Sequence, residues 1–264
     1  MITNWFITGD THRHFGRFNN YSFAQDYNSA VIILGDATFN WMLNEEDDAL
    51  KQAISNKYKM MIYCVRGNHE ARPQDIEGME LIFDGNVKGD VWYQPEYPNI
   101  RYFKDWGIYT INGLKTAVIG GAYSVDKWYR LGRHAIWFPN EQLTPDEMTQ
   151  CAKELSGAEF DLVLTHTCPL SWEPIDLFLG GIDQSKVDKS TEIFLENIKK
   201  QIRFRVWLFG HYHADRLERP GVEQFYRDTE NLDTVWQRWL NYDPKVAMSL
   251  DWWLSKSPNF YMEN

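Results

Sequence analysis

Five short apolar segments of this chain each end in side chains that can bind a metal ion. The segments cover residues 4–8, 30–34, 60–65, 160–164 and 205–209, and their length and composition predict buried β-strands. The polar side chains that follow them are Asp10 and His12, Asp36, Asn68 and His69, His166, and His211 and His213. Because ligands of an open α/β sheet bind at the carboxyl ends of its strands, we expect these side chains to share one site.

The Gly-Asn-His-Glu stretch at residues 67–70 would by itself fit an ordinary turn, since Gly and Asn are common turn residues. The distribution of histidine argues against that interpretation. Five of the seven histidines follow predicted strands, and only His14 and His134 lie elsewhere in the sequence. Core packing explains a single histidine well, but five at matching positions, joined by two aspartates and one asparagine, indicate a cluster of ligands.

The spacing of these residues predicts how they pair. In an extended segment residues i and i+2 point to the same side, so Asp10 with His12, and His211 with His213, would each offer two donors to one point. Mixed imidazole and carboxylate ligands suit divalent Mn, Fe, Zn, Co or Ni. Seven candidate ligands are too many for one ion that must leave room for water and substrate. Two ions that share a carboxylate and lie ~3.5–4 Å apart fit the number.

The rest of the pattern predicts an α/β domain. A helix over residues 45–58 would connect the second and third strands, and a hairpin around Asn112-Gly113 would make the sheet mixed. Further helices are predicted from Thr144, with a capping box, to near Gly157, and over residues 190–203. We expect residues 72–100 to be mostly loop with a short helix near 75–82. The C-terminal part would hold a strand near 221–226, a helix near 229–240 and an aromatic tail. We find no linker, which predicts a single domain over residues 1–264.

Composition limits the function classes. The formal charge of −10 argues against broad binding of long nucleic acid, which needs many phosphate contacts. A phosphate substrate held by metal ions remains compatible, because bound cations invert the local field. The three cysteines have no pairing pattern, which predicts core thiols in a reducing compartment. The N-terminus starts directly with a strand and no long apolar stretch follows, so we expect a cytoplasmic protein without membrane contact.

The ordered motifs Asp-x-His, Gly-Asp, Gly-Asn-His-Glu, His and Gly-His-x-His, between residues 10 and 213, resemble those of the calcineurin-like metallophosphoesterase superfamily. The resemblance implies a sandwich of two mixed β-sheets flanked by helices, with a dinuclear metal site at the carboxyl ends of the strands. It implies two divalent transition-metal ions, with Mn²⁺ expected first and Fe, Zn, Ni or Co as alternatives. The implied ligands are Asp10, His12 and His213 for one ion, Asn68, His166 and His211 for the other, and Asp36 as the bridge.

The resemblance also implies a role for His69, as a histidine beside the leaving oxygen that acts as general acid or stabilises the transition state. A hydroxide that bridges the two ions can attack the phosphorus, so only the leaving group still needs a proton. Glu70 would orient this neighbourhood. The predicted function is therefore hydrolysis of a phosphomonoester or phosphodiester, with a small phosphoester or nucleotide-like molecule as substrate.

Two features bear on the branch of the superfamily. Protein phosphatases carry Asp and Arg where this chain has Phe39 and Asn40, and Arg66 alone matches their phosphate-binding set. This departure argues against phosphoprotein phosphatase activity. The stretches Gly-Gly-Ala-Tyr-Ser at 120–124 and Thr-His-Thr-Cys-Pro at 165–169 are loosely similar to the phosphodiesterase and lariat-debranching branches.

Two other functions are compatible with such a fold. A scaffold that binds proteins could keep the fold and lose its metals, but that chain should lack ligands, and this one has all seven together with His69. Structural metal sites are closed and usually rich in cysteine, whereas no cysteine belongs to this set.

An aromatic and basic insertion follows Gly120, and its residues 123–138 are predicted to form a rim over the metals. Tyr123 could stack on a base, and Arg130 and Arg133 could meet phosphate, so these three are the candidate substrate-binding residues. In the alternative interpretation the aromatic side chains of the insertion only pin a long loop to the core.

Overall fold

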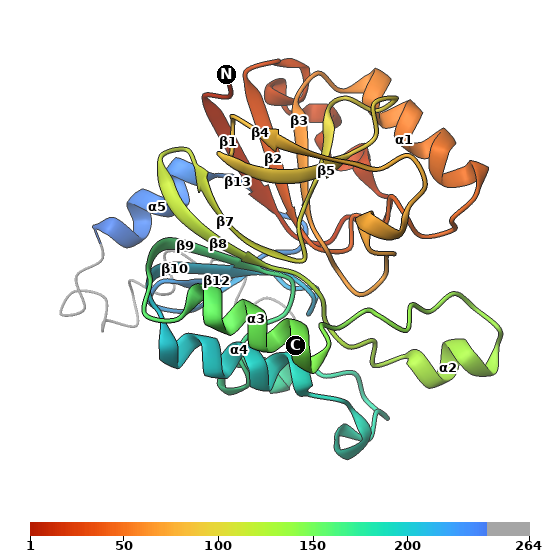
Figure 1. Ribbon diagram of the computed structural model, residues 1–264, viewed down its shortest axis with the longest axis vertical. Helices are drawn as coiled ribbons and strands as arrows, with labels where there is room; N and C mark the ends of the chain where they lie inside the picture. Colours follow the sequence, from red (N-terminus) through yellow and green to blue (C-terminus); the bar gives the residue numbers. More distant parts are fainter. Residues whose placement is uncertain (242–264) are drawn as a thin grey trace.

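The computed structural model describes residues 1–241, which form two β-sheets packed face to face with helices outside (Figure 1). The first sheet has the order β13-β1-β2-β3-β6-β5-β4. Its strands are β1 Asn4–Thr8, β2 Ser29–Leu34, β3 Met61–Val65, β4 Glu80–Asp84, β5 Gly89–Tyr93, β6 Ile100–Phe103 and β13 Thr229–Asn231. β1, β2, β3 and β6 run parallel to one another, and the remaining three strands are antiparallel to their neighbours.

The second sheet has the order β11-β12-β10-β9-β8-β7. Its strands are β7 Trp106–Ile111, β8 Leu114–Ile119, β9 Glu159–Thr165, β10 Arg203–Phe209, β11 Arg216–Arg219 and β12 Val222–Gln224. β8, β9, β10 and β12 are parallel, while β7 and β8 form the expected hairpin. Its turn residues Asn112 and Gly113 both have positive φ, 52° and 79°, as the tightest hairpin turns require.

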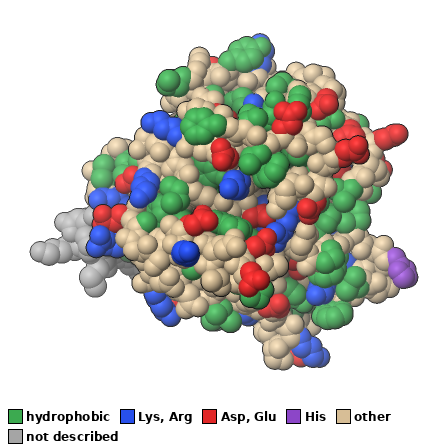
Figure 2. All heavy atoms as spheres, viewed as in Figure 1, with side chains coloured by type: hydrophobic (Ala, Val, Ile, Leu, Met, Phe, Trp, Pro, Cys, Tyr) green, Lys and Arg blue, Asp and Glu red, His purple; other side chains and the backbone are tan. Residues whose placement is uncertain are grey.

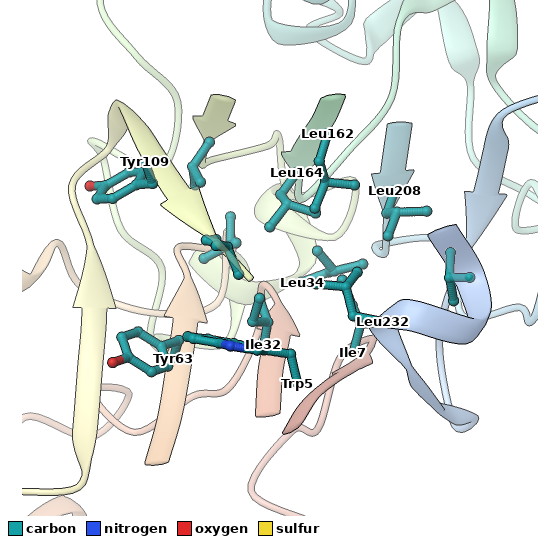
Figure 3. Packing of buried hydrophobic residues seen from close by; sticks show 14 of the residues in the cluster. Trp5, Ile7, Ile32, Leu34, Tyr63, Tyr109, Leu162, Leu164, Leu208 and Leu232 are labelled. Atoms are coloured by element: carbon teal, nitrogen blue, oxygen red, sulfur yellow. The ribbon is translucent and has the colours of Figure 1, made fainter. Parts of the chain in front are cut away.

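The main core lies between the two sheets. Ile7, Ile32 and Leu34 of the first sheet face Leu164 and Leu208 of the second (Figure 3). Alternate residues of each strand therefore point inward, which is the period-2 pattern of a packed sheet. The same core includes residues of both sheets and of α5 Leu232–Leu240, so the two sheets are held at a constant separation by shared packing.

Helices and turns cover the outer faces. On the first sheet, two 3₁₀ turns, Phe15–Asn20 and Ser22–Gln25, and helix α1 Glu45–Lys57 close a second, aromatic cluster. On the second sheet, α3 Pro145–Leu155 and α4 Ser190–Gln201 close a third. The capping box predicted at Thr144 and Glu147 is present, with both reciprocal hydrogen bonds. The short helix α2 Lys127–Gly132 belongs to the insertion, which projects from the body of the molecule (Figure 1).

The predicted α/β sandwich is confirmed, as are the strand near 221–226 and the helix near 229–240, but the prediction for residues 72–100 is wrong. Residues 72–100 are not mostly loop, since they contain β4, β5 and the start of β6, and residues 80–84 are strand where a helix was expected near 75–82. β4 lies at a sheet edge and leaves Leu81 and Phe83 exposed, so it lacks the alternation of a half-buried strand. β11 was missed, and the helix expected from residue 229 begins at Leu232. The aromatic tail lies outside the described residues, and the single domain over 1–264 stays a prediction.

Three structural features bear on the expectations drawn from composition: the helices, the distribution of surface charge and the cysteines. No helix within residues 1–241 is long and apolar enough to cross a bilayer. Acidic and basic side chains are interspersed on the face drawn in Figure 2, without a continuous basic stripe of the kind that tracks a nucleic-acid backbone. Cys64, Cys151 and Cys168 are buried and unpaired, as expected of core thiols.

Candidate metal centre

The loops after five strands meet at one end of the sandwich. β1, β2 and β3 are parallel neighbours in the first sheet, and β9 and β10 are parallel neighbours in the second. Parallel neighbours place their carboxyl ends at the same sheet edge, and the shared core brings the two edges together. All seven candidate ligands lie on these loops.

Asp10, His12 and His213 form the first group. The Nε2 atoms of His12 and His213 lie 2.9 Å apart, and they lie 3.7 Å and 3.2 Å from Oδ2 of Asp10. Asp10 is fully buried, and within residues 1–241 the contacts of its Oδ2 are with the two imidazoles, without a well-aligned hydrogen bond. A buried carboxylate oxygen without a donor is costly, and a cation between these three side chains would remove that cost.

Asn68, His166 and His211 form the second group. His166 Nε2 lies 2.9 Å from Asn68 Oδ1 and 3.3 Å from His211 Nδ1. Asp36 lies between the groups, because its Oδ2 is 3.6 Å from His166 Nε2 and 3.9 Å from His12 Nε2. The structure thus brings together all seven predicted ligands. Asp36 contacts both groups, and Asp10 of the first group also lies close to Asp36 and His166.

The backbone of this cluster corrects the predicted pairing. His12, Asp36, His211 and His213 have φ values of 43°, 48°, 72° and 55°, in the left-handed region. The expectation of extended segments is therefore wrong. Asp10 and His12 still share one group, as predicted, whereas His211 and His213 turn to different groups, as the family resemblance implies. Such conformations cost non-glycine residues of order 1–3 kcal/mol each and concentrate at functional sites.

Two glycines of the motifs are required by close approach. A Cβ atom on Gly35, whose φ is +92°, would lie 1.9 Å from Nδ1 of His166. A Cβ atom on Gly67 would lie 1.9 Å from Oδ1 of Asp36. Any side chain at either position would push the candidate ligands apart, which is why glycine stands there.

Glu70 joins the loops after β2 and β3. Its buried carboxylate accepts hydrogen bonds from the Gly67 N–H at 2.9 Å and the Thr38 N–H at 3.0 Å. Burial, followed by the nearby charge of Asp36, raises the pKa of Glu70 to about 7. These contacts support the predicted orienting role.

Two candidate ligands are held by residues that the sequence reasoning missed. Asn68 Nδ2 donates to Ser124 Oγ at 2.9 Å, and Ser124 Oγ donates to Glu141 Oε2 at 2.5 Å. These two hydrogen bonds orient the amide of Asn68 so that its Oδ1 faces His166. The Nδ1 atom of His166 lies 2.8 Å from the carbonyl oxygen of Leu34. The Leu34 contact makes Nδ1 the donor and leaves Nε2 free to bind an ion. Ser124 ended a quoted motif, but Glu141 follows the insertion with no motif around it.

The electrostatics of the cluster favour a bound cation. Burial by itself raises the pKa of Asp36, but His69 and His166 hold it well below its usual range. The pKa of Asp10 is also lowered, against the effect of burial. Burial lowers the pKa of His166, yet the charge of Asp36 raises it to about 9. Two ionised, buried carboxylates therefore attract positive charge, and the oxygen and nitrogen donors around them fit divalent transition metals.

His69 lies beside the second group, but its Nε2 is 3.3 Å from the amide nitrogen of Asn68 rather than from the candidate ligand oxygen. Its backbone N–H donates to Asp36 Oδ1 at 2.9 Å, while its Nε2 is 3.9 Å from Asp36 Oδ2. The ring packs edge-on against Trp41 with centroids 5.3 Å apart, and 17% of the side chain is exposed. Burial lowers the pKa of His69, so the imidazole is neutral at neutral pH.

A cavity of about 450 Å³ opens over the candidate ligands. Tyr123 and Arg130 line it, and Arg130 lies over the Trp41 ring at 4.8 Å while pairing with Asp126 at 2.7 Å. Arg133 stacks on Tyr129 instead and is not among the described residues that line the cavity. The structure therefore brings two of the three predicted substrate-binding residues to the site.

The arginine that matches protein phosphatases lies inside the protein. Arg66 is 3% exposed, pairs with Asp105 and donates to the Glu141 carbonyl oxygen at 2.7 Å. Phe39 is fully buried, and its ring stacks on Phe15 with centroids 4.4 Å apart. These side chains therefore act in packing and ion pairing inside the protein.

Comparison with known proteins adds the family. A search of curated proteins returned no match. The family model described as calcineurin-like phosphoesterase matches residues 5–215, which include all five ligand-bearing loops and the insertion. The match agrees with the two-sheet sandwich and with the clustered aspartates and histidines at its strand ends. This chain belongs to the calcineurin-like phosphoesterase family.

Proposed function

We propose that this protein is a dinuclear metal-dependent phosphodiesterase in which His69 assists departure of the leaving group. Metal-dependent hydrolysis of phosphoesters is the general activity of the family. The observation that carries the proposal is the position of Asp36, whose Oδ2 lies within 3.9 Å of ring nitrogens in both groups of candidate ligands. A carboxylate so placed can serve two cations at once.

In this proposal Asp10, His12 and His213 would hold one ion, and Asn68, His166 and His211 would hold the other, with Mn²⁺ as the expected metal. Two divalent ions would supply charge neutralisation for the phosphate and an activated water at neutral pH. The protein's own contribution is to fix these donors on rigid strand ends, so that little reorganisation is needed during the reaction.

His69 faces the cavity from beside Asp36 without joining either group. A neutral imidazole still offers one N–H, which can stabilise negative charge on the leaving oxygen. The arriving phosphate adds negative charge near the ring, favours its protonated form and so makes proton donation available. Its packing against Trp41 holds the ring in place for this task.

The diester is favoured over the monoester because of the cations around the cavity. Arg66 is buried away from it and Asn40 replaces an arginine. Among the described residues that line the cavity the cations are Arg130 and Lys189, and Lys189 is neutralised by its ion pair with Glu173. A diester carries one negative charge where a monoester carries two, and it needs fewer cations. The cavity volume of about 450 Å³ also leaves room for organic groups on both sides of the phosphorus.

Metal analysis combined with turnover tests the proposal. The protein should bind two ions per chain, hydrolyse bis(p-nitrophenyl) phosphate faster than p-nitrophenyl phosphate with Mn²⁺, and lose activity with a chelator. Bound metal without turnover of either ester would identify a structural metal site. Absence of both metal and turnover would identify a scaffold.

A further inference from the structure

The cavity extends beyond the metal centre to a second end, formed by Phe178, Val187, Glu192 and Tyr212. These residues come from the segment between β9 and α4, from α4 itself, and from the loop after β10. None of them has a role in holding metal or in assisting the leaving group. We call this part of the cavity the distal end.

Glu192 gives the distal end an unsatisfied acceptor. The residue is 3% exposed, and its Oε1 accepts a hydrogen bond from Thr167 Oγ1 at 2.8 Å. Its Oε2 has no hydrogen-bond partner within the described part of the chain. Lys189, a nearby cation, pairs with Glu173 at 2.6 Å instead. A buried carboxylate oxygen needs a donor, and a ligand in the cavity can provide it.

Two aromatic rings give the distal end flat surfaces. The rings of Phe178 and Tyr212 are inclined by only 21°, with centroids 6.3 Å apart. The Tyr212 hydroxyl lies 3.1 Å from Thr167 Oγ1, the same hydroxyl that donates to Glu192, so ring and carboxylate are held together. Tyr212 also stands between His211 and His213 in the sequence, which places these surfaces beside the metal centre.

We propose that the distal end binds the base of a nucleotide ester, stacked on the aromatic rings, while Glu192 accepts hydrogen bonds from the N–H groups of the base. The proposal deepens the proposed function, since it rests on the phosphate lying at the metal centre. Aromatic faces bind bases of any sequence, and an acceptor at the ring edge selects among them.

The chemistry of Glu192 predicts the order of bases. Guanine presents two adjacent donor groups, N1–H and N2–H₂, to a carboxylate. Adenine and cytosine present one amino group each. Uracil presents one N–H between two carbonyl oxygens, which a carboxylate repels. An aliphatic ester group would fill the apolar part of the cavity but would leave Oε2 without a donor, so a base fits better.

Calorimetry on the Mn²⁺-loaded protein near pH 8, where Glu192 is ionised because its pKa is about 7, tests this inference with GMP, UMP and ribose 5-phosphate as probes. GMP should bind more tightly than UMP and more tightly than ribose 5-phosphate. Glu192→Gln keeps the acceptor for Thr167 but replaces Oε2 by an amide donor, and we expect GMP to lose about 10-fold in affinity relative to ribose 5-phosphate. Phe178→Ala should weaken both nucleotides by roughly 5- to 150-fold relative to ribose 5-phosphate, the range for loss of one stacking ring. The Phe178→Ala variant therefore tests the same site if the Glu192→Gln variant does not fold.

Ile175→Ala is the matched control, because Ile175 is 75% exposed on the same segment and is not among the described residues that line the cavity. It should leave all three affinities unchanged. Equal affinities for GMP, UMP and ribose 5-phosphate would overturn the base-binding site, even in a protein that hydrolyses bis(p-nitrophenyl) phosphate. Absence of hydrolysis with any metal, together with a preserved preference for GMP, would instead overturn the proposed function and leave this site standing.

Discussion

The side-chain amide of Asn68 donates a hydrogen bond to the hydroxyl of Ser124, with 2.9 Å between Nδ2 and Oγ. Ser124 in turn bonds to Glu141, which also accepts from the Trp137 indole N–H at 2.9 Å. Ser124 and Glu141 lie at the two ends of the insertion. The two ends of the insertion are therefore linked to the candidate ligand Asn68. Their hydrogen bonds determine that the oxygen of the Asn68 amide, and not its nitrogen, faces His166 and His211.

Ser124→Ala should weaken binding of one of the two ions about 10- to 100-fold, because an amide without this acceptor can rotate its oxygen away from the site. Calorimetric titration of the metal-free variant with Mn²⁺ measures the affinity for each ion. Ser171→Ala is the control, since Ser171 also donates to a glutamate, Glu196, at 2.8 Å, but at an exposed position. Two ions bound with wild-type affinity in the Ser124 variant would show that the hydrogen bond does not orient Asn68.

Asp36→Asn should lower the occupancy of both metal positions, because it removes the negative charge that both groups of ligands share. Elemental analysis of the purified variant gives the metal content per chain. Asp84→Asn is the control. Asp84 is also a buried aspartate, but it accepts a hydrogen bond from the Tyr63 hydroxyl and is not a candidate ligand, so this variant should keep both ions. A fully loaded, active Asp36 variant would refute its bridging role.

His69→Ala should keep both ions and lose rate by ~10²–10⁴, the usual range for removal of a general acid–base group. The loss should be smaller for esters with good leaving groups, which barely need a proton. Turnover of p-nitrophenyl and alkyl esters, measured together with metal content, checks both statements. Collapse of the metal content would make His69 a ligand.

Arg130→Ala should raise KM for a nucleotide ester, because Arg130 lines the cavity above Trp41. Arg133→Ala removes the same charge from the same insertion, yet its guanidinium lies over Tyr129 instead. Steady-state kinetics should therefore separate the two variants. Equal increases in KM would mean that the insertion acts through its net charge, and a lower melting temperature alone would mean that Arg130 is structural.

Glu192 should make stability depend on pH. Burial raises its pKa from 4.5 to about 7, and the titratable groups that face it are Glu173, Lys189, Tyr212 and Cys168. The folded protein then holds a proton that the unfolded chain releases, so the free energy of unfolding falls as pH rises from about 4.5 to about 7 and is level above that. Glu192→Gln cannot ionise and should lose this component, worth at most about 3 kcal/mol.

Urea unfolding of metal-free protein near pH 5 and near pH 8 measures the difference between wild type and Glu192→Gln. The variant should gain stability relative to wild type at the higher pH. A difference that is the same at both pH values would show that Glu192 has an ordinary pKa in the folded protein.

Local patterns were sufficient for the strands, the caps and the positions of the candidate ligands. The five ligand-bearing strands, the Asn112-Gly113 hairpin and the Thr144 cap depend on hydrophobicity, turn chemistry and capping within a few residues. The strands β4 and β5 could not be predicted in this way. β5 joins the sheet through its tertiary contact with β6, and β4, which pairs with β5, is an exposed edge with little hydrophobic periodicity in its sequence.

The sequence was sufficient to predict the candidate metal ligands, because the ordered motifs place each donor directly after a strand. Strand periodicity did not predict how the donors divide; the family resemblance implied the division, and the tertiary contacts give its physical reason. His211 and His213 serve different groups because their left-handed backbone overrides the alternation of an extended segment, and that conformation persists only where the surrounding loops impose it. Ser124, Glu141 and Glu192 carry no motif for their roles. They reach the site through contacts between segments distant in sequence, and only packing brings those segments together.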